Sequence, residues 1–163
     1  MPRDYSLHKT TTKLFNASQL ERTLFMAFSK DNLLRQLDQK KRIDWALELK
    51  NGREAYEFLV GAVKQDLLNV HQTRNALIAL FRIRGHGTAT DVLHVFVESA
   101  RHINKDIRSE AVRLAIGLVR FSRLTHKEPL DFSDEQAKML RNAIAEGLTP
   151  KVKALARDFF GVR

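Results

Sequence analysis

The chain of 163 residues lacks cysteine altogether and contains only three prolines and seven glycines. Without cysteine it can form no disulfide bond, no zinc site with thiolate ligands and no cysteine nucleophile. Proline and glycine are the residues that most often interrupt helices, and both are scarce here. No segment shows the strict two-residue alternation of a half-buried strand. We therefore expect an all-α protein without a β-sheet.

Long apolar segments are also missing from the sequence. No run of about 18 apolar residues occurs, so we expect no membrane-spanning helix. The first nine residues contain no apolar core, so we expect no secretory signal peptide. Hydrophobic residues make up 44% of the chain and charged residues 29%, which is typical of a globular domain. We expect a single domain located in the cytoplasm.

The known catalytic and cofactor-binding motifs are absent as well. The sequence has no phosphate-binding loop and no nucleophile elbow. Gly85–Gly87 follows a predicted helix rather than a strand, so we interpret it as a helix stop. Six histidines are present, but His86, His94 and His102 are each eight residues apart, roughly 12 Å along a helix, which is too far to share a metal ion. We expect no metal, no cofactor and no enzymatic activity.

Helical signals dominate and divide the single domain into three parts. Residues 1–15 are expected to form a polar arm, residues 16–52 irregular N-terminal helices, and residues 53–163 a series of antiparallel helical hairpins. The number of helices predicted in total is seven to nine. Either a short α-solenoid or an irregular helical bundle satisfies this pattern.

Several residues mark the predicted ends of helices. Asp31 is expected to cap one helix, and Asn51–Gly52 to end the next. Ser133 and Gln136 have the spacing of a capping box, in which each side chain binds the other residue's backbone N–H. Pro150 fits the first position of the last helix, where its missing N–H costs nothing.

Three segments of the chain resemble one another. Thr73–Phe81, Ile107–Ile116 and Val152–Phe160 each begin with an apolar residue or threonine, followed by Arg or Lys and by apolar residues at helical spacing. A pattern of this kind resembles HEAT-type helical repeats, in which stacked hairpins form a right-handed solenoid. The resemblance implies that Asp106 and Arg108 form bonds between neighbouring repeats.

A second, more local resemblance concerns the C-terminal half. Ile103–Asn104, Arg123–Phe132 and Val152–Phe160 are similar to segments of the small helical subunit of CRISPR Cascade complexes. Those subunits are basic, all-helical and line a nucleic-acid path. The resemblance implies an accessory subunit of a larger ribonucleoprotein, whose arginines before the loop at 125–133 meet a strand backbone.

The charge of the chain is its most unusual property. It has 28 basic and 19 acidic residues, a net charge of +9, and the excess lies in residues 1–50 and 101–163. Such an excess favours a polyanionic partner. At 100° per residue, four arginines of one helix lie within an arc of about 140°. The candidate polyanion-binding residues are Arg108, Arg113, Arg120 and Arg123, with Lys40, Lys41 and Arg42 as a second cluster.

We therefore interpret the chain as a non-enzymatic binding protein. The first hypothesis is binding of nucleic acid or another polyanion to this basic helical face. The alternative is a HEAT-like protein–protein adaptor that binds an acidic partner. A solvated basic face, balanced by acids such as Glu110, is the simplest explanation without a partner. Only Phe121 lies close to the arginines in the sequence, so stacking of nucleobases is not predicted.

Overall fold

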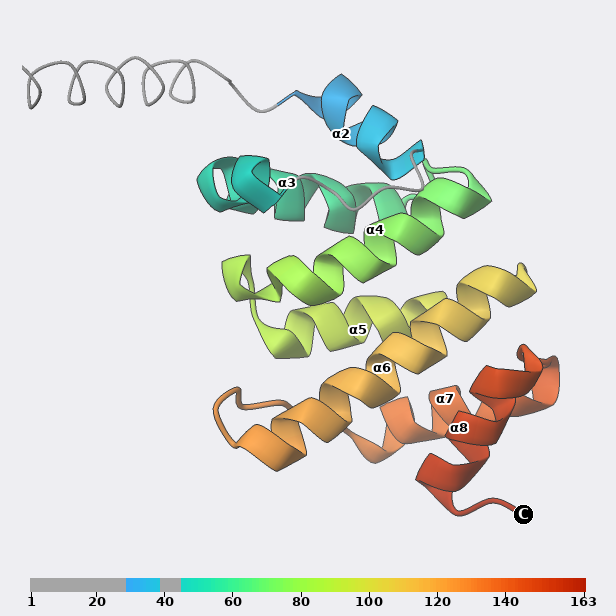
Figure 1. The fold of residues 1–163 in the computed structure, drawn as a ribbon. Coiled ribbons are helices and arrows are strands. Elements are labelled where there is room, and N and C mark those ends of the chain that lie inside the picture. Colours follow the sequence, from blue (N-terminus) through green and yellow to red (C-terminus); the bar gives the residue numbers. More distant parts are fainter. Residues whose placement is uncertain (1–28, 39–44) are drawn as a thin grey trace, which may run out of the picture.

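The computed structural model describes residues 29–38 and 45–163. The polar arm predicted for residues 1–15, the first helix predicted after it, and the cluster Lys40–Arg42 lie outside the described residues. The described part is helical throughout, as the sequence predicts, and contains seven α-helices and one short 3₁₀ helix, η1 (Figure 1). They are α2 (Lys30–Asp38), α3 (Trp45–Lys64), α4 (Val70–Ile83), η1 (Arg84–His86), α5 (Ala89–Ser99), α6 (Lys105–Thr125), α7 (Asp134–Glu146) and α8 (Pro150–Phe160).

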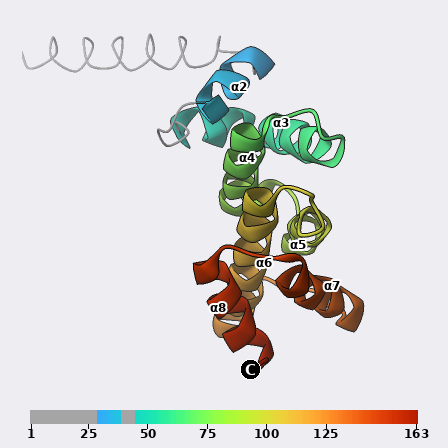
Figure 2. The same cartoon turned by 90° about the vertical axis from the view of Figure 1, so that its right-hand side faces the viewer.

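The helices form a stack of hairpins in two layers. Short turns join α3 to α4, α5 to α6 and α7 to α8, so each pair is a hairpin. Helices α4, α6 and α8 pack on one another in one layer, and α3, α5 and α7 form the other (Figure 2). Helix α2 covers the first hairpin by packing against α3 and α4. An amphipathic helix cannot bury its apolar face alone, and stacking gives every face a neighbour.

Two of the predicted helix starts are confirmed, those of α7 and α8. Ser133 and Gln136 form the predicted capping box at the start of α7, and Pro150 is the first residue of α8. The start of α5 is capped by Thr88, whose side chain accepts the N–H of Asp91. Each such cap satisfies a backbone donor that the helix itself leaves free.

Two predicted helix ends are wrong. Helix α2 begins one residue before Asp31, and the Oγ of Ser29 accepts the N–H of Asn32. Helix α3 runs without interruption through Asn51–Gly52. The reason for the glycine is close packing, because a Cβ atom at Gly52 would overlap the imidazole of His86 in η1. Contact with η1 thus explains a residue that the sequence alone suggested as a helix stop.

The turn after α4 depends on a second close approach. A Cβ atom at Gly87 would overlap the phenol of Tyr56 on α3, whereas one at Gly85 would meet no atom within 4 Å. Burial of Tyr56, and secondarily the charge of Asp91, raise the pKa of its phenol above the usual 10.0. The tyrosine is therefore held in a packed position against the turn.

We expect Gly87→Ala to lower the free energy of unfolding by about 1–3 kcal/mol, because the added methyl group displaces a packed ring. Gly85→Ala is the matched control, and it should change stability by less than about 1 kcal/mol. Urea denaturation of both variants measures the difference. Equal stabilities would show that Tyr56 moves aside without cost.

Candidate polyanion-binding surface

The two layers of the stack carry opposite net charges. Helices α4, α6 and α8 contain ten lysines and arginines against three acidic residues, a net charge of +7. Helices α3, α5 and α7 contain five basic and eight acidic residues, a net charge of −3. The helices alternate along the sequence between the two layers (Figure 2). The separation of charge therefore arises only when the stack is assembled.

The prediction that Arg108 lies on an open basic face is wrong. Its residue is 7% exposed, and its guanidinium donates to backbone carbonyls of two turns. Nη1 donates to His102 O (2.8 Å) and Ile103 O (3.1 Å) in the turn before α6. Nε and Nη2 both donate to Gly147 O (2.9 and 2.7 Å), and Nη2 also donates to Glu146 O (3.1 Å). Arg108 thus joins two neighbouring hairpins of the stack.

Arg113 does lie on the surface, and it shares a carboxylate with an arginine that the sequence did not single out. The side chain of Arg113 is 46% exposed and that of Arg74, on α4, is 43% exposed. Glu110 is buried between α4 and α6: Arg113 donates to one of its oxygens, and Arg74 Nη2 lies 3.9 Å from the other. The absence of any acidic residue from α4 was the signal that could have pointed to Arg74.

Arg120 and Arg123 lie where α6 meets α8. Arg120 is seven residues after Arg113, so the two share one face of α6, and its side chain is 42% exposed. Its Nη2 donates to Asp158 Oδ2 at 3.1 Å. The guanidinium carbons of Arg120 and Arg123 each lie 5.6 Å from the centre of the Phe159 ring.

These pairings link basic residues of three helices in one layer. Lys151 is seven residues before Asp158, so it lies on the face of α8 that meets Arg120. Of the four predicted arginines on α6, the fold brings three together on this surface and places Arg108 inside. We call the following residues the basic band: Arg74 on α4, Arg113, Arg120 and Arg123 on α6, and Lys151 on α8.

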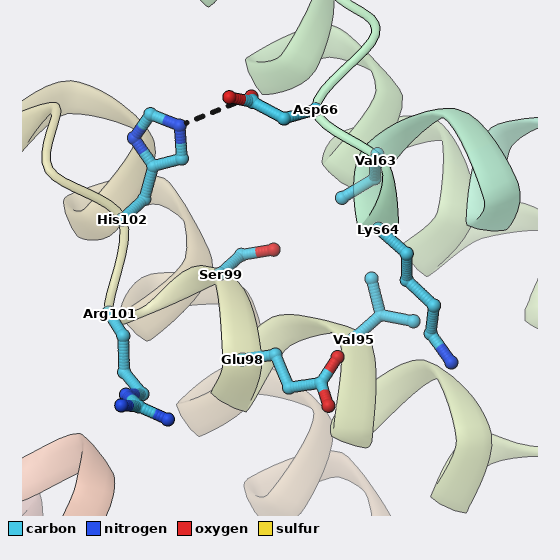
Figure 3. Close-up of a pocket in the computed structure, with 8 residues that line it drawn as sticks. All are labelled: Val63, Lys64, Asp66, Val95, Glu98, Ser99, Arg101 and His102. Carbon is cyan, nitrogen blue, oxygen red and sulfur yellow. Dashed lines mark ion pairs between the residues drawn. The ribbon is translucent and has the colours of Figure 1, made fainter.

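A pocket of about 480 Å³ lies on the other layer, between the C-terminal ends of α3 and α5 (Figure 3). It contains a serine, a histidine and an aspartate, the residue types of a hydrolase triad. His102 Nε2 lies 3.5 Å from Asp66 Oδ1, and its Nδ1 accepts the N–H of Asn104 at 2.9 Å. Both ring nitrogens are engaged, so in this arrangement neither accepts the proton of Ser99 as a triad histidine would.

Charges of both signs line the same pocket. Lys64 and Arg101 are balanced by Asp66 and Glu98 (Figure 3). Within residues 29–38 and 45–163, no group of three histidine or acidic side chains is placed to hold a metal ion. The pocket therefore lacks the uniform charge that distinguishes the basic band.

Comparison of the chain with protein families, curated proteins and solved structures gives no match. None of the helices in the part of the chain that the structure describes is both long and apolar enough to cross a membrane.

Proposed function

We propose that the protein is a non-enzymatic binding protein that engages nucleic acid through the basic band. The observation that carries the proposal is the separation of charge, +7 in the layer of α4, α6 and α8 against −3 in the other. A polyanion gains affinity for such a surface by releasing condensed counterions from its phosphates. Helices held in a fixed stack keep these charges at fixed spacings, which lowers the entropy lost on binding.

The arginines of the band retain donors for phosphate oxygens. A guanidinium has five N–H groups. Arg113 uses its Nε and Nη2 on Glu110, and Arg120 uses its Nη2 on Asp158. The remaining donors are available on side chains that are nearly half exposed. The carboxylates hold the guanidiniums in place but accept only some of their N–H donors.

The alternative is an adaptor that binds an acidic protein. The same charge favours it, and stacked helical hairpins present extended binding surfaces. An acidic protein differs from nucleic acid in its charge density, which is lower and less regular than one phosphate per nucleotide. Direct titration with nucleic acid therefore distinguishes the two functions.

Substitutions at the Arg120–Asp158 pair should change affinity in opposite directions. Arg120→Ala should weaken binding by up to about tenfold at about 0.1 M salt, the counterion-release contribution of one phosphate contact. Asp158→Asn should strengthen binding, because it removes an exposed negative charge and frees Arg120. Fluorescence anisotropy with a labelled oligonucleotide measures both.

The matched control is the ion pair of Arg53 and Glu57 on α3, whose side chains are 80% and 62% exposed and which lies in the other layer. Arg53→Ala and Glu57→Gln should leave the affinity within about twofold, since a charge in the opposite layer is screened at this salt concentration. If these control substitutions change affinity as much as Arg120→Ala and Asp158→Asn do, only net charge matters and the basic band is not the binding surface.

A further inference from the structure

Two adjacent phenylalanine rings of α8 are flanked by arginines, from α6 on one side and from α7 on the other. Arg120 and Arg123 of α6 lie over the ring of Phe159, each at 5.6 Å. The rings of Phe159 and Phe160 meet edge to face, with their centres 4.8 Å apart. Arg141 of α7 lies 5.6 Å from the centre of the Phe160 ring.

The two rings are anchored but accessible. Both phenylalanines are half-buried, and both pack against the hydrophobic core. In the described part of the chain, α8 packs only against α6 and α7, so no further helix covers the outer side of α8 (Figure 1). Packing against the core fixes the rings, and each residue keeps part of its surface exposed.

Phe121, the one aromatic residue close to the arginines in the sequence, has a different environment. Its ring lies 5.0 Å from the guanidinium of Arg84, which is also 4.9 Å from the ring of Phe81. Arg84 in turn donates to both carboxylate oxygens of Glu128. This arginine is held between two rings and a carboxylate, so Phe121 serves to join η1 to the end of α6.

We infer that the ligand of the basic band is a single-stranded nucleic acid, with bases stacked on Phe159 and Phe160 and phosphates bound by the arginines beside them. The inference rests on the proposed function and specifies its ligand. Bases of a single strand can be splayed out and stacked on aromatic rings, whereas a duplex keeps its bases paired inside. Aromatic rings interleaved with cations are the combination that single-strand binding requires.

The test uses four probes with the full-length protein: a short single-stranded oligodeoxythymidine, an abasic strand of equal length, a duplex of equal length, and heparin. Stacking predicts that the oligodeoxythymidine binds tighter than the abasic strand, although both carry the same phosphates. Phe159→Leu keeps an apolar side chain in the same place but removes the ring. It should weaken single-strand binding by about tenfold, the order expected from one stacked base, and leave binding of the abasic strand and heparin unchanged.

Phe58→Leu is the matched control. Phe58 is also half-buried beneath a cation, with Lys30 Nζ at 5.7 Å from its ring, but it belongs to α3 in the other layer. It should leave all four affinities unchanged, and circular dichroism confirms that both variants are folded.

The outcomes separate the two proposals. If the abasic strand and the oligodeoxythymidine bind equally and Phe159→Leu changes neither affinity, stacking is refuted while polyanion binding stands. If the wild-type protein binds none of the four probes, the proposed function fails, and the inference fails with it.

Discussion

Replacing Arg113 and Arg120 together with glutamate is expected to abolish nucleic-acid binding. The two residues share one face of α6 and lie at the centre of the basic band, between Arg74 on α4 and Lys151 on α8. Removing two phosphate contacts alone costs close to a hundredfold in affinity at about 0.1 M salt. Two new carboxylates add repulsion of the phosphates, so we expect a loss of more than about a hundredfold.

Lysine at both positions is the control for the loss of charge, because Arg113→Lys with Arg120→Lys keeps both cations and should retain most of the affinity. Arg113→Glu removes a partner of the buried Glu110 carboxylate and places a second acidic group beside it, so the stability of every variant must be measured by urea denaturation. A glutamate double variant that is folded and still binds within about threefold of the wild type would exclude α6 as the binding surface.

Loss of Arg108 is expected to have the largest effect on stability. Its guanidinium makes five hydrogen bonds to four carbonyl oxygens, in the turns before α6 and before α8. Arg108→Ala leaves those buried acceptors without a donor and also opens a cavity. We expect the free energy of unfolding to fall by about 3–5 kcal/mol.

Urea denaturation of Arg108→Ala measures this cost, and Arg101→Ala is the control, since Arg101 is an exposed arginine in the turn that Arg108 holds. The control should change stability by less than about 0.5 kcal/mol. Without urea, and provided that it is folded, the Arg108→Ala variant should bind nucleic acid with the affinity of the wild type, because Arg108 is buried. Unchanged stability together with lost binding would reverse the assignment of Arg108.

The sequence predicted the helices well because their signals are local. A capping box, a proline in the first helical turn and helical spacing of apolar residues all depend on neighbours within a few positions, as at Ser133 and Pro150. The prediction failed at Gly52, where a packing partner 34 residues away explains the glycine. Contacts between residues so far apart in the chain produce no pattern in the local sequence.

The candidate site was predicted only in part for the same reason. The helical wheel placed Arg113, Arg120 and Arg123 on one face, but it could not show that the turn before α8 supplies carbonyl acceptors for Arg108. Nor could it show that Phe159 lies beside Arg120, because the two residues are 39 positions apart. The order of packing of α4, α6 and α8 decides which charges share a surface.

The most direct test of the central claim is the salt dependence of binding. A fluorescence titration of the wild-type protein with short single-stranded and duplex DNA and RNA, at several salt concentrations, gives the slope of log affinity against log salt. Each phosphate neutralised contributes about −0.7 to −0.9 to this slope. Binding through the basic band therefore predicts a total slope of about −2 to −4. Replacing Arg113 and Arg120 with alanine should flatten it by up to about two. Binding no tighter than about 1 mM at 0.15 M salt, for every nucleic acid tried, would contradict the claim and favour the adaptor.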